Sequence, residues 1–152
     1  MRRRILALDL AMHTGWAMSD LPGQPVWGCW KLAPPAQTDA ALLSLKAWVL
    51  VTIAEGATEV WIERPLPAIA ATHQRTSAFL MALATVARLC TIEQGLRFRE
   101  VHAATARKAV VGRGNASKPE VRDWCASQGW AVTDHNAADA LVVLRYAEMQ
   151  AP

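Results

Sequence analysis

Three acidic side chains in this sequence stand within or beside apolar segments that would form the core of a folded protein. Asp9 ends the apolar run Ile5–Leu8, Glu63 ends a second such run, and Asp139 precedes the apolar run Ala140–Leu144. A carboxylate in such surroundings is costly unless a cation, a metal ion or hydrogen-bond donors compensate it. Three acids far apart in the chain could converge in the fold, which is the pattern of an acid-ligated divalent metal site.

Such a site suits the hydrolysis of phosphodiesters. This reaction needs a hydroxide placed in line with the leaving group and charge neutralised on two oxygens, and two divalent ions about 4 Å apart supply both. Mg²⁺ prefers carboxylates and water as ligands. We therefore expect Asp9, Glu63 and Asp139 to hold Mg²⁺ or Mn²⁺, with two ions per active site and Asp9 bridging them.

Each acid also has a purely structural interpretation. Asp9 could cap the end of a strand, and Glu63 could pair with the adjacent Arg64. Asp139 could be an acid in the first turn of a helix, favoured there by the helix dipole. Taken one at a time, the acids leave both interpretations open.

Basic residues cluster in the second half of the chain. Seven of them fall within 26 residues, where only Glu100 and Glu120 oppose them. They are Arg97, Arg99, Arg107, Lys108, Arg113, Lys118 and Arg122. Basic segments beside an acidic centre are typical of proteins that bind phosphate-bearing partners, although a solvated surface can have the same composition.

Length and composition predict one globular domain, residues 1–152. The chain is long enough for one buried core and too short for two ordinary ones, and 53% hydrophobic residues exclude a disordered protein. Cys29, Cys90 and Cys125 are odd in number and lack CxxC spacing, which indicates a reducing compartment and no zinc site. No apolar run approaches the ~20 residues of a membrane span, so we expect no membrane association.

Apolar patterning and breakers predict the order of elements. The predicted strands are 4–10, 16–19, 26–32, 60–63 and 96–101. The predicted helices are 38–56, 73–94, 105–111, 117–127 and one that follows 134–136. The segment His13–Gly15 is interpreted as a tight turn, Thr38 as an N-cap and Ser117 as a second N-cap. This order predicts an α/β protein with a mixed sheet flanked by helices.

The predicted helix 73–94 is apolar nearly all round. Its apolar residues at spacings of three and four include Ala78, Phe79, Ala82, Leu83 and Val86. Such a helix is either central in the core or shared with a partner chain. We expect a homodimer built on it, with Phe79, Leu83 and Val86 supplying buried area, and the alternative is a helix wholly inside one protomer.

Four blocks, taken in order, resemble the RuvC-type Holliday junction resolvases, which have the ribonuclease H-like fold. The blocks are Ile5–Asp9 with Thr14–Ala17, Val60–Glu63, Arg107–Lys118 and Asn136–Leu141. The resemblance covers roughly residues 4–148, and its most specific block is Arg107–Lys118. The compact segment before Asp139 looks most like that of bacteriophage members. The resemblance implies a central mixed five-stranded sheet flanked by helices.

The resemblance also implies a ligand set. It makes the three acids metal ligands and requires a fourth, an Asp or His just before the last acid. Cellular members carry it three residues earlier, where this chain has Asn136. His135 is four residues before Asp139, which is also a same-face spacing on a helix, and a neutral imidazole is a good ligand and a potential base. We favour His135, with Asp134 and Asn136 as alternates.

The same resemblance places Arg107 and Lys118 near the scissile phosphate, with Lys118 among the catalytic residues. Lys108, Arg113 and Arg122 are the further DNA-binding candidates in the basic cluster. Leu66 stands where cellular members carry an aromatic wedge against the bases at the crossover, and we expect it to act as an aliphatic wedge.

Together these features predict a divalent-metal-dependent, structure-selective endonuclease. It would resolve four-way junctions or other branched DNA by paired phosphodiester hydrolysis, in the cytoplasm of a bacterium or of a phage-infected host. Two alternatives are a non-catalytic junction-binding protein and a nucleotide-binding module of the ribonuclease H and actin-like fold. The intact triad of acids argues against the first. The second would need Gly-rich phosphate loops after both hairpins, and only Thr14-Gly15 is present.

Overall fold

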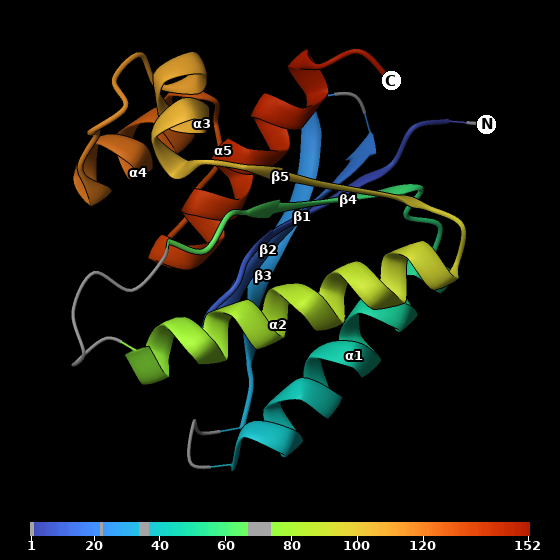
Figure 1. Ribbon diagram of the computed structural model, residues 1–152. Helices are drawn as coiled ribbons and strands as arrows, with labels where there is room; N and C mark the ends of the chain where they lie inside the picture. The colour runs from blue at the N-terminus through green and yellow to red at the C-terminus, as the bar shows by residue number, and fades with distance from the viewer. Residues whose placement is uncertain (1, 22, 34–36, 67–73) are drawn as a thin grey trace.

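The computed structural model describes residues 2–21, 23–33, 37–66 and 74–152, which form one five-stranded sheet with helices on both faces (Figure 1). The strands are β1 (Ile5–Asp9), β2 (His13–Leu21), β3 (Gln24–Lys31), β4 (Glu59–Glu63) and β5 (Arg97–Val101). The helices are α1 (Thr38–Ala54), α2 (Gln74–Glu93), α3 (Ala103–Val110), α4 (Lys118–Ser127) and α5 (His135–Met149).

The strand order is β3-β2-β1-β4-β5, and the sheet is mixed. The strands β1, β2 and β3 form an antiparallel meander, whereas β4 pairs parallel to β1 and β5 parallel to β4. Parallel strands need crossover connections, and α1 and α2 supply them. The predicted mixed five-stranded sheet with flanking helices is confirmed.

Alternation along the central strand β1 divides the core into two layers. Leu6 and Leu8 pack with residues of α1 and α2 on one face, and Ile5 and Ala7 pack with residues of α3, α4 and α5 on the other. Because successive side chains of a strand point to opposite faces, Asp9 continues the row of Ile5 and Ala7 toward α5. All four apolar residues are buried, which fixes the register of the strand and with it the direction of Asp9.

Helix α5 begins in direct contact with β2. Gly15 pairs with Asp9 across β1 and β2, and a Cβ atom added at Gly15 would lie 1.9 Å from the Asn136 carbonyl oxygen. The Asn136 side chain donates a hydrogen bond to the His13 carbonyl at 2.7 Å. Only glycine admits this approach, so the first turn of α5 lies next to Asp9.

Two local predictions are wrong. His13–Gly15 belongs to β2 and not to a turn; Thr14 is buried, and its hydroxyl donates to the Ala11 carbonyl at 2.6 Å, which closes the turn one step earlier. The N-cap of α1 is Gln37, without a side-chain hydrogen bond, and Thr38 is the first helical residue. Ser117 does cap α4, in a capping box with Glu120. His73, the predicted start of α2, lies outside the described residues.

Helix α2 packs one face on its own sheet. Leu83 is fully buried and Phe79 nearly so, in the core layer of α1 and α2, so the prediction that these two side chains supply a dimer interface is wrong. Leu89 and Ile92 are about half exposed on the outer side.

The segment Thr76–Glu93 is long and apolar enough to cross a membrane by length and composition alone, a test that core helices of soluble proteins also pass.

The contact at Gly15 predicts a sensitive position. Gly15→Ala would force the α5 N-terminus away from β2, and overpacking of this kind costs about 1–3 kcal/mol or more. We expect lower stability in urea unfolding. Gly28→Ala is the control, since the three atoms nearest to its Cβ, at 2.9 to 3.0 Å, all belong to the Trp16 side chain, and a side chain shifts more easily than a backbone. Equal stability of Gly15→Ala and wild type would contradict the contact.

Candidate active site

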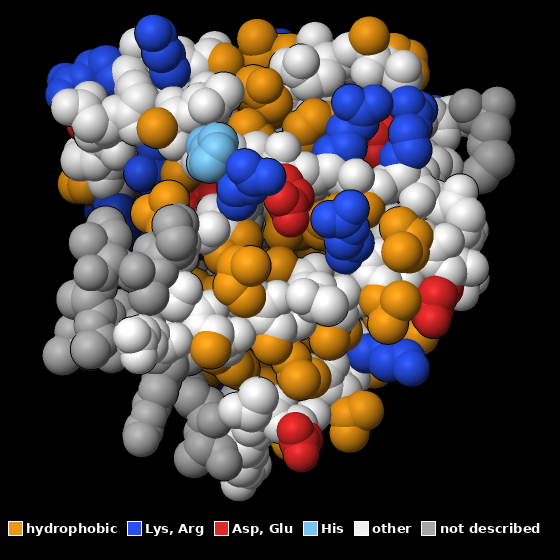
Figure 2. All heavy atoms as spheres, in the orientation of Figure 1, with side chains coloured by type: hydrophobic (Ala, Val, Ile, Leu, Met, Phe, Trp, Pro, Cys, Tyr) orange, Lys and Arg blue, Asp and Glu red, His pale blue; other side chains and the backbone are white. Residues whose placement is uncertain are grey.

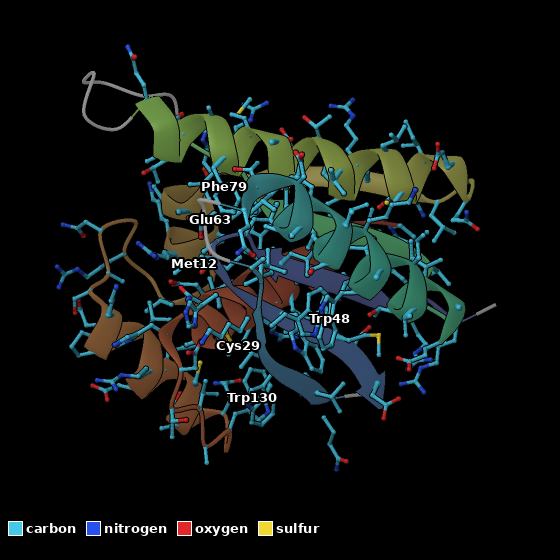
Figure 3. The ribbon with its side chains drawn as sticks, turned by 90° about the horizontal axis from the view of Figure 1, so that it is seen from below. Met12, Cys29, Trp48, Glu63, Phe79 and Trp130 are labelled. Atoms are coloured by element: carbon cyan, nitrogen blue, oxygen red, sulfur yellow. The ribbon has the colours of Figure 1, made fainter. Side chains whose placement is uncertain are left out.

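Asp9 and Glu63 meet at the carboxyl end of two adjacent parallel strands. The register pairs Leu8 with Ile62, which sets the two acids next to each other at the same edge. Trp61 lies in the core layer of α5, so Glu63, two residues on, points to the same face as Asp9. Figure 3 shows Glu63 at this end of the sheet.

The carboxyl groups affect one another electrostatically. Burial raises the pKa of Asp9 well above its ordinary value, and the charges of Glu63 and Asp139 raise it further. Burial also raises the pKa of Glu63, and the charge of Asp139 adds to the shift. The geometry brings the third acid to this edge, because α5 begins against Gly15, the cross-strand partner of Asp9, and Asp139 follows one turn later. A cation bound at this position would stabilise the ionised form of all three carboxyl groups.

Arg107 of α3 forms an ion pair with one of these acids. Its Nη2 donates to Asp139 Oδ1 at 3.0 Å, and the Asp139 side chain is only 12% exposed. Its charge also lowers the pKa of Asp9 and of Glu63, against the larger effect of burial. Asp139 lies in the second turn of α5 and Arg64 pairs with Glu100, so the interpretations of Asp139 as a first-turn acid and of Glu63 as a partner of Arg64 are both wrong.

The types of donor atom gathered here are types that bind divalent cations. Carboxylate oxygens from three elements converge, and a buried nitrogen, His135 Nδ1, has no hydrogen-bond partner. Among the described residues, however, no three His, Cys, Asp or Glu side chains stand in a geometry that would hold one metal ion. The three acids thus lie in one negatively charged region, in which the Asp139 carboxylate pairs with Arg107.

The three candidates for the fourth ligand have different surroundings. The Asp134 carboxylate caps α5 by accepting from the Ala137 N–H at 2.9 Å. The Asn136 amide donates a hydrogen bond to the His13 carbonyl. Of the three, only His135 has a buried polar atom that is not satisfied. This difference supports His135 over the alternates, whose polar groups hold the start of α5 in place.

The side chains of the remaining predicted residues form no hydrogen bond or ion pair with the three acids. Arg113 pairs with Glu120 at 3.1 Å. Lys108 and Lys118 are exposed and form no ion pair within the part of the chain that the structure describes. Leu66 is 68% exposed beyond the end of β4, as a wedge would need to be. Only Arg107 of the basic set contacts an acid of the centre.

An apolar cavity of about 890 Å³ adjoins Asp9 on the side of α1 and α2. Met12 and Phe79, both labelled in Figure 3, line it. The bond between Arg107 and Asp139 is a feature of the site that the sequence did not predict, because 32 residues separate the two and no local pattern pairs them.

Comparison with known proteins adds a fold-level match. No family model and no curated protein sequence matches the chain. Among the solved structures that match, two cover nearly the full length of the chain. A Thermus thermophilus RuvC structure matches with a TM-score of 0.71 and 18% identity, over 96% of both chains. T. thermophilus RuvC in complex with a Holliday junction substrate matches with a TM-score of 0.73 and 16% identity, over 97% of this chain and 96% of that one. The chain therefore has the fold of RuvC.

Proposed function

We propose that this protein is a divalent-metal-dependent endonuclease that cuts four-way junctions or other branched DNA. The observation that carries the proposal is the convergence of Asp9, Glu63 and Asp139 at the carboxyl end of two parallel strands. The match to RuvC bound to a Holliday junction supports the class of substrate. The activity would serve recombination and repair in a bacterial or phage-infected cytoplasm.

The chain's own residues would divide the work as follows. Asp9, Glu63 and Asp139, with His135, would hold Mg²⁺ or Mn²⁺, and the bound ions would supply the hydroxide and neutralise the charge of the phosphate. Because β1 and β4 are buried and paired, Asp9 and Glu63 are held rigidly. Arg107 and Lys118, with Lys108, Arg113 and Arg122, would hold the backbone of the DNA electrostatically.

We further propose a homodimer, because a four-way junction has two equivalent strands to cut. Two active sites related by a two-fold axis would cut them symmetrically. The outer side of α2 would form the interface, since Leu89 and Ile92 remain 50% and 52% exposed there in the protomer.

Removal of the central acid should separate cutting from binding. Asp9→Asn would remove a metal ligand without removing a phosphate contact, so we expect nicking of a four-way junction in Mg²⁺ to be lost while binding is largely kept. Asp20→Asn, at a half-exposed acid paired with Arg4, is the matched control and should cut normally. An Asp9→Asn variant that cuts at the wild-type rate would rule out the assigned site. A wild type that binds junctions but never cuts them would favour a non-catalytic junction-binding protein.

The raised pKa of Asp9 predicts a pH-dependent stability in EDTA. The folded state keeps its proton to higher pH than the unfolded state, whose Asp pKa is about 3.9, so wild type loses stability as the pH rises from there through the folded pKa. Asp9→Asn has no such carboxyl group and does not lose this stability, so it should melt at a higher temperature than wild type at pH 7. The expected rise is ~2–4 °C for each kcal/mol of unfolding free energy that wild type loses.

Mg²⁺ should then raise the melting temperature of wild type more than that of Asp9→Asn, because ligand binding to the folded state stabilises it. Equal Mg²⁺ shifts in the two proteins at pH 7 would argue against a metal at Asp9.

The fourth ligand can be tested with single substitutions. If His135 is a ligand or a base, His135→Ala should slow nicking by roughly 10²-fold or more. His135→Asp should keep part of the activity and be less inhibited at acid pH than wild type, since a carboxylate stays ionised where an imidazole gains a proton. His13→Ala, at an exposed histidine of β2, is the control. Wild-type rates for His135→Ala would move the role to Asp134 or Asn136.

The dimer has its own test, sedimentation equilibrium at tens of micromolar. Leu89→Asp should produce a folded monomer, whereas Val51→Asp, at a similarly exposed apolar residue of α1, should leave the dimer intact. Leu83→Asp should unfold the protein, because Leu83 is core. A wild type that stays monomeric even with junction DNA would refute the dimer.

A further inference from the structure

A second basic feature lies on the other face of β4 from Glu63. Arg64 follows β4 directly, and its backbone N–H donates to the Val101 carbonyl at 2.8 Å, so Arg64 continues the pairing with β5. Because strand side chains alternate, Arg64 points away from Glu63 and toward α2. There it lines a cleft of about 620 Å³ between α2 and the edge formed by β4 and β5.

Two guanidinium groups border this cleft, and each is held by a different contact. Arg64 Nε donates to Glu100 Oε2 at 3.1 Å, and Arg64 Nη1 lies 3.3 Å from His102 Nε2. Arg88 of α2 lies over the Phe98 ring, 5.8 Å from its centre, and has no hydrogen bond or ion pair with any other described residue. A guanidinium stacked on a ring keeps the N–H donors in its plane free.

The floor of the cleft is apolar. Met81 and Ala84 of α2 and Pro65 supply this apolar surface, and Ser77, whose hydroxyl donates to the Leu66 carbonyl at 3.3 Å, also lines the cleft. Figure 2 shows this face of the molecule, where Lys and Arg side chains border a patch of hydrophobic atoms. Low-dielectric walls strengthen the field of nearby charges. Two guanidiniums against the one carboxylate of Glu100 leave the lining with a net positive charge.

We propose that this cleft binds one nucleotide unit of the DNA strand that crosses the end of β4, with a backbone phosphodiester on Arg88 and Arg64 and the deoxyribose against the apolar floor. A phosphate accepts paired N–H bonds from a guanidinium. The volume lies within the range of about 300–1,000 Å³ typical of sites for organic ligands, and is more than a bare ion needs. The inference rests on the proposed function.

The cleft is distinct from the basic segment of α3 and α4. That segment lies on the α5 face of the sheet, with Arg107 on Asp139, whereas Arg64 and Arg88 lie on the α2 face. DNA that contacts both would pass around the end of β4, where Glu63 stands. Leu89 and Ile92 do not line the cleft, but Ile92 is four residues from Arg88 on the same face of α2, so a dimer that uses Ile92 would lie beside the cleft.

The test measures binding of a four-way junction as a function of salt, in the Asp9→Asn background to prevent cutting. Arg88→Gln should raise Kd by roughly 3- to 10-fold at low salt and reduce the slope of log K against log salt by about 0.9, the value for one phosphate contact. Arg88→Lys should keep the slope and recover part of the affinity. Arg145→Gln makes the same charge change on α5, where Arg145 pairs with Glu148, and should change neither quantity.

Several outcomes would decide against the cleft. Equal slopes and Kd values for Arg88→Gln and Arg145→Gln, with wild-type protein that still nicks junctions in Mg²⁺, would overturn the cleft and leave the proposed function standing. A wild-type protein that neither binds nor nicks junctions would instead refute the proposed function. Loss of the dimer in Arg88→Gln with an unchanged slope would make the cleft a subunit contact. Binding of millimolar thymidine monophosphate that Arg88→Gln abolishes, together with equal DNA-binding slopes for Arg88→Gln and Arg145→Gln, would assign the cleft to a free nucleotide and overturn its role in DNA binding.

Discussion

The first turn of α5 lies directly against the backbone of β2 at Gly15, and the positions of the candidate active-site residues depend on this contact. Gly15 is the cross-strand partner of Asp9, so a helix that touches Gly15 necessarily begins beside that acid. The Asn136 amide and the Asp134 cap hold the same turn from two sides. Asp139 follows one turn later, which brings an acid from near the C-terminus to the end of the first strand.

This arrangement concentrates negative charge at a buried position, where the charged form of a carboxyl group is disfavoured. Burial and mutual repulsion raise the pKa of Asp9 and of Glu63, and the single guanidinium of Arg107 offsets part of this effect. Folding tolerates such a cluster because β1 and β4 are paired on both sides and their other side chains are buried. A fold that holds carboxylates together in this way is suited to binding divalent cations, which a neutral core could not do.

Most of the elements could be predicted from the sequence because their patterns are local. The apolar runs that end in Asp9 and Glu63, and the Ser117 capping box, depend on neighbouring residues only. The turn at Thr14 was misplaced because a buried hydroxyl bond to Ala11 overrides the preference of the Thr-Gly pair for a turn. Leu83 was assigned to an interface because periodicity shows that a helix face is apolar but not what covers it.

Contacts between distant residues could not be predicted. Arg107 was placed near the phosphate, but its bond to Asp139 depends on how α3 packs against α5. The cleft at Arg64 and Arg88 was missed for the same reason, although one signal was present: Arg88 is a single charge in the middle of an otherwise apolar stretch of α2. A charge at such a position needs either a surface or a partner, and the structure shows that it reaches the edge of the sheet at Phe98.

The most direct test of the central claim is a crystal structure of the protein grown with Mn²⁺, with anomalous differences measured for the metal. The account predicts at least one Mn²⁺ peak bound by Asp9, with Glu63 or Asp139 as a second ligand. Crystals at millimolar Mn²⁺ that show no anomalous peak at Asp9, with Asp139 still bonded to Arg107, would contradict it.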